Sequence, residues 1–405
     1  MKTRLVLAIS LALAAHAASA TQLSSVSQLA FGPDDVLFIA DWKQSSIHAV
    51  ELPASRADAG KTFNIRDLDS VLTSALGPGV LAIEDLAVRP GTGEAYIAVS
   101  VGEAKVPAIV VVTSDGMATK LDVAAAQASR YAIDDAPKDQ TEFWHEIPER
   151  SFTVTDMKWY DGELFVAGLS NQDFASTLRR IPYPFTGKET TTSVEIYHTS
   201  HNQIETRAPI RTMAIANVGG TPTLIAAYTC TPLVTIPLAD LKAGAHVRGK
   251  TIAELGYGNT PADLLHYQMT ADGKTVDYLF LTNLNRSSDV IPLASVEAAA
   301  AKPGMSTYVE FGKITGVDTM QAPMAGAIRT DNLDANFLLT ARRDLATGKS
   351  ELVSVTKFGF FRLSDFVSEY NFPEYSYTNE FQRTQIKPVQ DALMTQEGFA
   401  DEIRK

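Results

Sequence analysis

A unit of two short apolar strands joined by a turn recurs along the chain, and it constrains the fold more than any other feature. The first copy is SQLAFGPDDVLFIAD and the second is EDLAVRPGTGEAYIAVS. The later copies read TDMKWYDGELFVAGLS, RTMAIANVGGTPTLIAAYT, ADLLHYQMTADGKTVDYLFLTN and AGAIRTDNLDANFLLTA. A turn rich in Gly, Asp, Asn or Pro separates the two apolar runs, and a third run follows most copies. The pattern predicts consecutive antiparallel strands.

The spacing of the copies indicates how these strands are assembled. The copies begin at residues 27, 84, 155, 211, 262 and 325, so the intervals run from 51 to 71 residues. Such a period, built from short strands, is typical of propeller blades, each a four-stranded antiparallel sheet. A closed ring buries blade faces that one blade alone leaves exposed. We therefore expect an all-β chain with a single β-propeller of six four-stranded blades around a central channel. A seventh blade requires a further sheet in residues 101–150 or 350–385.

The two ends of the chain differ from this repeat. Residues 1–20 combine Lys2 and Arg4 with an apolar stretch and end in Ala-Ser-Ala, a pattern that predicts a cleaved signal peptide and a periplasmic or secreted protein. No other segment is long and apolar enough to predict a membrane span. The propeller is expected over residues 21–365. Residues 366–405 have helical composition and are expected to form an extension that packs on the propeller or closes it.

Charge and cysteine content exclude several functions. Cleavage after Ala20 removes two of the 35 basic residues and none of the 47 acidic ones, so the formal charge falls from −12 to −14. This balance argues against nucleic acid as a partner. Cys230 is the only cysteine, which excludes an intramolecular disulfide and a haem attachment motif. A buried, inert thiol is the default interpretation of Cys230, and a catalytic role needs a neighbouring histidine.

The stretch FGPDDVLFIADWKQSSIHAVEL resembles a blade of the NHL-repeat and lactonase-type propeller superfamily, in which a Pro-Asp-Gly-like turn precedes an apolar strand. At the level of single blades the resemblance covers most of residues 27–360. Gluconolactonase-type relatives hold a divalent metal with Glu, Asn and Asp from inner strands, and the resemblance puts Glu84 at the first of these positions. The other ligands are missing, because the equivalent positions hold Ser27, Thr155, Arg211, Ala262 and Ala325.

The repeat alignment also brings carboxylates into one column. After Gln28, this column holds Asp85, Asp156, Thr212, Asp263 and Gly326. Oxygen ligands from several blades suit a hard cation, so Glu84, Asp85, Asp156 and Asp263 are candidate ligands for calcium or another divalent cation. Alternatively, each aspartate caps backbone amides of a neighbouring turn or pairs with Arg211. Adjacent strand residues face opposite ways, so only one column can face the channel throughout.

A second candidate metal site lies in EIYHTSHNQIETRAPIRTM. His198 and His201, with Glu205 nearby, are candidate ligands for zinc or copper. On an extended loop this spacing does not place both imidazoles on one face, and the third ligand is unspecified. Binding of an anion by Arg207 and Arg211 is an equal alternative to a metal, and a structural or surface role of these residues is the default interpretation.

Polar residues at the ends of the second strands predict a third site. Equivalent ends can share one rim of the ring, where a polar ligand or a partner protein would bind. The candidate ligand-binding residues of the channel and rim are Asp41, Trp42, Arg207, Arg211, Asn283, Asn285 and Arg286.

Three functions stay open from the sequence. The first is an exported propeller that binds a small molecule or a periplasmic partner protein at its axial funnel, without a complete catalytic motif. The second is a lactonase-type hydrolase that depends on a divalent metal. The third is the propeller subunit of a periplasmic redox enzyme whose cofactor is bound by another chain.

Overall fold

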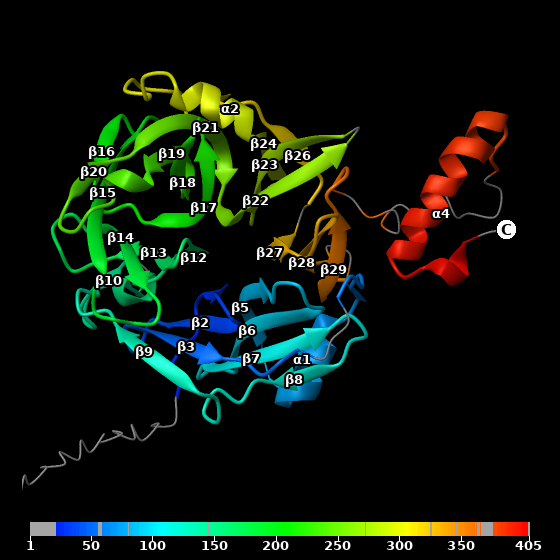
Figure 1. Ribbon diagram of the computed structural model, residues 1–405, viewed down its shortest axis with the longest axis horizontal. Helices are drawn as coiled ribbons and strands as arrows, with labels where there is room; N and C mark the ends of the chain where they lie inside the picture. Colours follow the sequence, from blue (N-terminus) through cyan, green and yellow to red (C-terminus); the bar gives the residue numbers. More distant parts are fainter. Residues whose placement is uncertain are drawn as a thin grey trace, which may run out of the picture.

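The computed structural model describes residues 22–55, 59–79, 81–144, 146–271, 273–324, 326–344, 347–360, 362, 365 and 376–403. Six sheets of four to six strands stand around a central axis as a six-bladed β-propeller (Figure 1). The predicted signal peptide lies outside the described residues, and so does the start of the predicted C-terminal extension. In the described part of the chain no helix is both long and apolar enough to cross a membrane.

The first three blades come from the N-terminal half. Blade 1 contains β1 (Leu29–Phe31), β2 (Val36–Asp41), β3 (Ser46–Glu51) and β9 (Ala128–Ala132). Blade 2 contains β5 (Leu81–Val88), β6 (Glu94–Val101), β7 (Val106–Thr113) and β8 (Ala118–Lys120). Blade 3 contains β12 (Asp156–Tyr160), β13 (Glu163–Leu169), β14 (Ser176–Pro182), β15 (Thr190–His198) and β16 (Gln203–Glu205), and β20 (His246–Arg248) pairs with β15.

The other three blades follow in the C-terminal half. Blade 4 contains β17 (Ile210–Val218), β18 (Thr221–Tyr228), β19 (Cys230–Pro237), β21 (Lys250–Asn259) and β25 (Ile314–Thr315). Blade 5 contains β22 (Pro261–Ala271), β23 (Lys274–Asn283), β24 (Ser288–Pro292) and β26 (Met320–Ala322). Blade 6 contains β27 (Ala327–Asn332), β28 (Phe337–Arg343), β29 (Ser350–Thr356) and β4 (Asn64–Ile65).

The six recurring units of the sequence each form one blade, which confirms the predicted architecture. The described parts of the two divergent segments contain no further blade. Residues 101–150 supply β7, β8, β9 and a two-stranded ribbon of β10 (Glu142–Phe143) and β11 (Ile147–Pro148), and the segment from 350 supplies β29. The alternative of seven blades therefore finds no support in the part of the chain that the structure describes.

The blades do not follow one another around the ring in sequence order. Neighbouring inner strands give the circular order 1, 3, 4, 5, 6, 2 (Figure 1). After β3 the chain adds β4 to the outer edge of blade 6, where Ile65 pairs with Leu352, and then forms blade 2. It returns to blade 1 with β9, where Ala128 pairs with Val50, before it enters blade 3. Two outer strands from distant parts of the sequence thus tie the ring together.

The hydrophobic core is divided among the junctions between blades. Each of the six junctions has its own cluster of buried side chains, and each cluster draws residues from both blades. Between blades 1 and 3, for example, Phe38 stacks on Trp159 with ring centroids 5.7 Å apart, and Tyr183 and Phe185 pack against Phe38. Because both faces of a blade are covered by its neighbours, the second strands β2, β6, β13 and β18 are buried along nearly their whole length.

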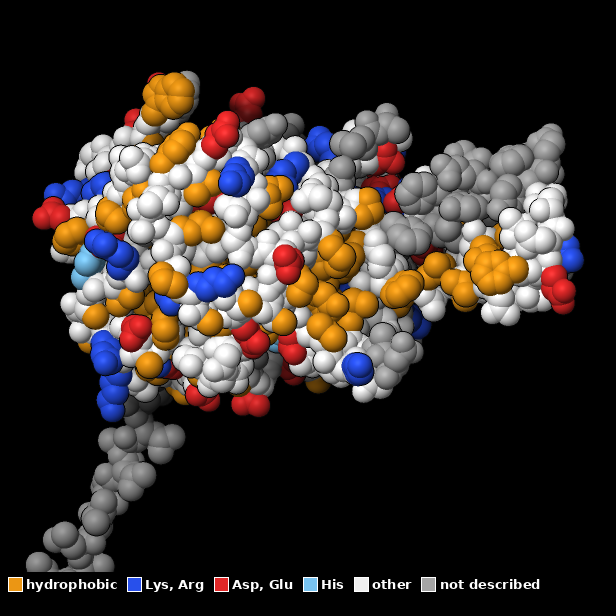
Figure 2. All heavy atoms as spheres, turned by 90° about the horizontal axis from the view of Figure 1, so that it is seen from above, with side chains coloured by type: hydrophobic (Ala, Val, Ile, Leu, Met, Phe, Trp, Pro, Cys, Tyr) orange, Lys and Arg blue, Asp and Glu red, His pale blue; other side chains and the backbone are white. Residues whose placement is uncertain are grey.

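Short helices lie outside the blade sheets. They are α1 (Leu68–Leu76), α2 (Leu293–Ala300), α4 (Lys387–Gln396), the 3₁₀ turns η1 (Glu149–Phe152), η2 (Leu238–Asp240) and η5 (Ala400–Glu402), and the π-turn η4 (Gln382–Ile386). Asp67 caps α1 by accepting the backbone N–H of Ser70. The segment with α4 projects beyond the ring (Figures 1 and 2). Its C-terminal end meets blade 6, where Arg362 donates to the Glu397 carbonyl at 3.1 Å.

Candidate functional site

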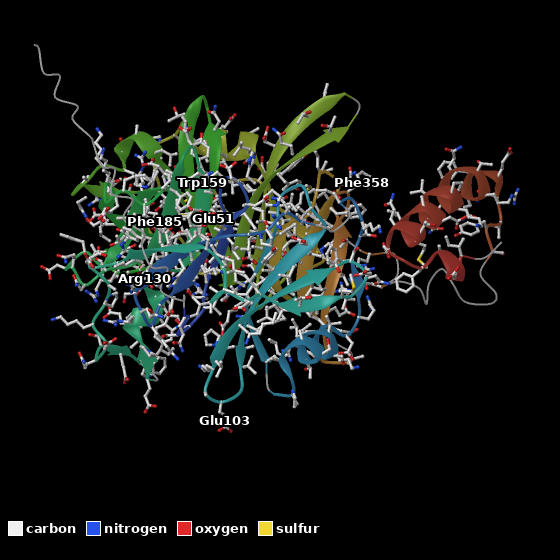
Figure 3. All side chains as sticks on the ribbon, turned by 60° about the horizontal axis from the view of Figure 1, so that its bottom comes forward. Glu51, Glu103, Arg130, Trp159, Phe185 and Phe358 are labelled. Atoms are coloured by element: carbon white, nitrogen blue, oxygen red, sulfur yellow. The ribbon has the colours of Figure 1, made fainter. Side chains whose placement is uncertain are left out.

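A cavity lies in the central channel of the propeller. This channel pocket has a volume of about 510 Å³ and is lined by inner-strand residues of blades 1, 2, 3, 5 and 6. It includes Pro90, Gly91 and Asp334, which follow the last residues of inner strands, so the pocket reaches the end of the ring at which the inner strands finish. Trp159 also lines the pocket, and its ring stacks on Phe38 in the core between blades 1 and 3; Figure 3 shows it in the same region as Phe185.

The charge of the pocket lining is strongly unbalanced. Among its residues Lys158 is the one base, whereas five are acids: Asp85, Asp156, Asp263, Asp331 and Asp334. Lys158 Nζ lies 3.1 Å from Asp156 Oδ1. Arg329, beside the pocket, is 3.4 Å from Asp85 Oδ1 and donates to the Glu84 carbonyl. These cations offset only part of the negative charge.

Four of these carboxylates, which we call the channel aspartates, also join neighbouring blades. Each accepts a backbone N–H from the next inner strand: Leu29 to Asp85 at 2.6 Å, Met213 to Asp156 at 2.7 Å, Thr330 to Asp263 at 2.8 Å and Val88 to Asp331 at 2.8 Å. At the junction of blades 4 and 5 the Thr212 hydroxyl accepts from Leu264 instead. At five of the six junctions, a side-chain oxygen of one inner strand thus accepts a backbone N–H from the next inner strand. The acceptor lies on the same side of the junction each time around the ring.

Blade 6 departs from the column expected from the sequence. The alignment put Gly326 there, but the donor Thr330 follows Arg329, as the donors Leu29, Met213 and Leu264 follow Gln28, Thr212 and Asp263. Arg329 therefore takes the column position. The acceptor role passes to Asp331, two residues further along the strand on the same face. A bulge between Ala327 and Arg329 precedes this position, as bulges between Ile83 and Asp85 and between Ile210 and Thr212 do in blades 2 and 4.

Burial makes two channel aspartates weak acids. It raises the pKa of Asp85 to about 7, against the opposing effect of Arg329 and with a further contribution from Asp263. Burial likewise raises the pKa of Asp331 to about 6, although the hydrogen bond from Val88 lowers it. The pKa of Asp263 is also raised by burial, while Arg329 and Lys158 oppose the shift. The pocket therefore changes its charge in the pH range in which most proteins operate.

This titration predicts that the protein is less stable above neutral pH. Between about pH 4, where carboxyl groups of the unfolded chain titrate, and about pH 7 the folded state binds more protons, so its free energy of unfolding falls as the pH rises. For Asp85, which is 4% exposed, we expect a loss of about 2 kcal/mol between pH 5 and pH 8. Urea denaturation at both pH values measures it. Asp85→Asn should remove most of this difference, and an unchanged pH dependence in the variant would contradict the assignment.

The structure does not gather the predicted oxygen ligands around one ion. Glu84, Asp85, Asp156 and Asp263 do not form a group of three or more whose ligand atoms all lie within 4.8 Å of one another. Two oxygens bound to one calcium ion lie no more than about 5.2 Å apart, because calcium–oxygen distances are about 2.3 to 2.6 Å. The three aspartates instead accept backbone N–H groups, and Glu84 contributes its carbonyl to Arg329.

The predicted rim residues do not line the channel pocket. The pocket excludes all seven of them: Asp41, Trp42, Arg207, Arg211, Asn283, Asn285 and Arg286. The reason is the antiparallel direction of neighbouring strands. The second strand of a blade ends where its inner strand begins, opposite the mouth of the pocket, as the pairing of Asn283 with Pro261 shows.

Most rim side chains are bound within the protein. Asp41 is fully buried and accepts from Ser24, Ser25 and Gln44. The other contacts are those of Asn283 and Arg286 with Asp289, of Asn285 with Thr260, of Arg207 with Glu149, and of Lys43 with the Trp42 ring. Arg211 is a different case: burial and Arg329 lower its pKa, and its Nε is buried without a hydrogen-bond partner among the described residues.

The histidines of the H-x-x-H motif come together with the cysteine. The expectation that an extended loop separates His198 and His201 is wrong, because residues 199–202 form a tight turn between β15 and β16. The two rings stack with centroids 3.8 Å apart. One ring nitrogen of each histidine and Cys230 Sγ all lie within 4.8 Å of one another. We call these three residues the His–Cys cluster.

The surroundings of Cys230 oppose its use as an unassisted nucleophile. Burial raises the pKa of the thiol, and the carboxylates of Glu254 and Glu205 raise it further. A cysteine nucleophile needs the opposite shift, which is produced by neighbouring positive charge. Glu205 is ionised: burial opposes this, but hydrogen bonds from His198 and His201 hold its pKa at about 2.

The pocket residues that were not identified from the sequence include Lys158, Trp159, Asp331 and Asp334. Lys158 lies two residues after Asp156 on the same strand, so the period of two indicates that both face the channel. The same period relates Asp331 to Arg329. These residues could therefore have been found by following the alternation of side-chain direction along each inner strand beyond its first residues.

Comparison with known proteins shows no close relative. No protein-family model matches the chain, and no curated protein matches it in sequence. Among solved structures, the chain is similar to the PQQ-bound form of aldose sugar dehydrogenase from Streptomyces coelicolor, with 11% identity, a TM-score of 0.33 and coverage of 83% of this chain and 95% of that one. Extracellular domains 1-2 of Drosophila semaphorin 1b match with 10% identity, a TM-score of 0.35 and coverage of 82% and 85%. The narrower resemblance to NHL-repeat and lactonase-type propellers rests on the blade motif alone.

Proposed function

We propose that the protein is an exported propeller that binds a small organic cation in its channel pocket and acts by binding rather than by catalysis. The observation that carries the proposal is the pocket itself, in which five aspartates and one lysine line about 510 Å³. This volume is in the range of pockets that take small molecules. An ammonium group can meet the carboxylates at hydrogen-bond distance without the convergence of oxygens that a bare metal ion needs.

The state of the carboxyl groups supports a positively charged ligand. The pKa of Asp85 is about 7 and that of Asp331 about 6, because burial is not fully offset by positive charge. A bound cation would supply that charge and drive protons off these groups. The net charge of −14 expected for the exported chain favours the approach of cations.

Titration calorimetry with spermidine and choline tests this proposal. We expect binding that is tighter at pH 8 than at pH 5.5, with release of protons, and no comparable binding of glucose. Protons are counted by repeating the titration in two buffers of different ionisation enthalpy. If neither amine binds, or if glucose binds equally well, a cation-binding pocket is the wrong assignment.

Two variants change the pocket charge in opposite directions. Asp334→Asn should weaken amine binding by about tenfold, equivalent to about 1.4 kcal/mol, and keeps its two hydrogen bonds because Asn336 and Phe337 both donate to Oδ1. Lys158→Gln should strengthen binding. Asp115→Asn is the matched control: it removes one charge at an exposed turn, and both donors of Asp115 also use Oδ1. Equal effects of the two Asp→Asn changes would mean that only net charge matters.

A further inference from the structure

The His–Cys cluster lies at the other end of the ring from the channel-pocket mouth. His198 ends β15 of blade 3, and Cys230 begins β19 of blade 4. Tyr228, two residues before Cys230, pairs with Ile210 at the start of β17, so the cluster stands where the inner strands begin. His198 contacts Thr231 across the junction at 3.2 Å. The cluster therefore bridges two blades and is separate from the proposed ligand pocket.

We propose that His198, His201 and Cys230 form a binding site for one borderline or soft transition-metal ion, of which Zn²⁺ is the reference case. Two imidazoles and a thiolate are the donors that such ions prefer over carboxylates and carbonyls. The three donor atoms lie within 4.8 Å of one another. Zinc–nitrogen and zinc–sulfur bonds of about 2.0 to 2.3 Å require only a small further closing of the side chains.

A carboxylate behind the histidines orients both rings. Glu205 Oε2 lies 3.0 Å from Nδ1 of His198, and Glu205 Oε1 lies 2.6 Å from Nδ1 of His201. When each Nδ1–H donates to this carboxylate, each Nε2 carries a lone pair that is available to a metal. Such carboxylate–histidine pairs fix the tautomer and direction of metal-binding imidazoles. Here a single carboxylate does so for both.

The charge around the cluster also favours a cation. Besides Glu205, the side chain of Glu254 is 1% exposed and raises the pKa of the Cys230 thiol through its charge. Its Oε1 accepts from Thr199, whereas Oε2 is buried without a hydrogen-bond partner in the described part of the chain. A buried carboxylate oxygen left in this way is costly unless positive charge lies near. A divalent ion in the cluster would supply it.

Metal entry needs two local changes. The Thr231 hydroxyl, now 3.2 Å from His198 Nε2, has to turn away, and Ser200 Oγ at 3.4 Å offers it another partner. The Cys230 thiol has to release its proton to solvent as the sulfur–metal bond forms. Three protein donors leave a fourth position for water or an external ligand.

Titration of the reduced, full-length protein with Co²⁺ and Zn²⁺ tests the site. We expect one equivalent of Co²⁺ to bind with a thiolate-to-metal charge-transfer band, Zn²⁺ to displace it, and Ca²⁺ not to compete. Zn²⁺ should also raise the melting temperature, because it joins blades 3 and 4, and should protect Cys230 from alkylation. The alkylation measurement uses the natural chain, so it remains decisive where a variant fails to fold.

Variants distinguish metal binding at the His–Cys cluster from metal binding by other histidines. Cys230→Ser should abolish the charge-transfer band. His201→Ala should weaken binding roughly 100-fold or more, since loss of a group that only hydrogen-bonds to a metal ligand costs about 10- to 100-fold. His246→Ala is the matched control, because His246 also pairs with a glutamate, Glu195 at 3.0 Å, and lies outside the cluster. Absence of stoichiometric binding, alkylation that Zn²⁺ does not slow, or equal losses in all three variants would each overturn the proposal.

Discussion

Asp156→Ala is expected to lower the free energy of unfolding by about 3 to 5 kcal/mol, because this buried carboxylate joins two blades and balances the charge of Lys158. Its Oδ2 accepts from the Met213 backbone at 2.7 Å and from the Thr212 hydroxyl at 3.0 Å. Its Oδ1 accepts from its neighbour Met157 and lies 3.1 Å from Lys158 Nζ. Alanine leaves all four donors without this acceptor in a site that is 5% exposed.

Two further variants identify the source of that loss. Asp156→Asn retains an oxygen for the Met213 N–H but removes the charge beside Lys158. Its free energy of unfolding should therefore lie between those of the wild type and of Asp156→Ala. Asp173→Ala removes an exposed aspartate of the same blade and should change stability by less than about 0.5 kcal/mol. Urea denaturation measures all three. A loss below about 1 kcal/mol for Asp156→Ala would show that the junction of blades 3 and 4 does not depend on this contact.

The blades were predictable from the sequence because each blade is built from local signals. A turn and two or three apolar runs identify it, and all six units match observed sheets. The order of the blades around the ring was not predictable. It depends on β4 and β9, which pair with strands far away in the sequence, and β4 has only two residues. So short a strand carries no pattern that could identify its partner.

Site residues were predictable only in blades where the sequence alignment of the repeats matches the structural alignment of the inner strands. Asp85, Asp156 and Asp263 line the pocket as one column because their blades share a register. In blade 6 Arg329 takes that position and Asp331 is the acceptor, which alignment on the turns did not show. The convergence of Cys230 on His198 depends on the packing of blade 4 against blade 3. Spacing along the chain contains no information about it.

Gly168→Ala should be nearly as damaging as Asp156→Ala, with a loss of about 3 to 5 kcal/mol, although it adds a single methyl group. Gly168 lies in β13, and a Cβ there would stand 2.0 Å from the Thr153 carbonyl oxygen and 2.9 Å from that of Phe152. These are backbone atoms, so rotation of a side chain cannot relieve the clash. The Thr153 carbonyl also accepts from Arg179, which is 1% exposed and is held by Asp135 at 2.8 Å.

Gly162→Ala in the preceding turn is the matched control. Gly162 has a φ of +84°, but no other atom lies within 4 Å of its added Cβ, so alanine meets only the backbone preference, about 1 kcal/mol. The two variants make the same chemical change within one hairpin. Their urea denaturation midpoints should therefore differ clearly, with Gly168→Ala the lower. Equal midpoints would mean that β13 and the turn at Thr153 can separate at little cost, and that close packing of this turn does not hold blade 3 in place.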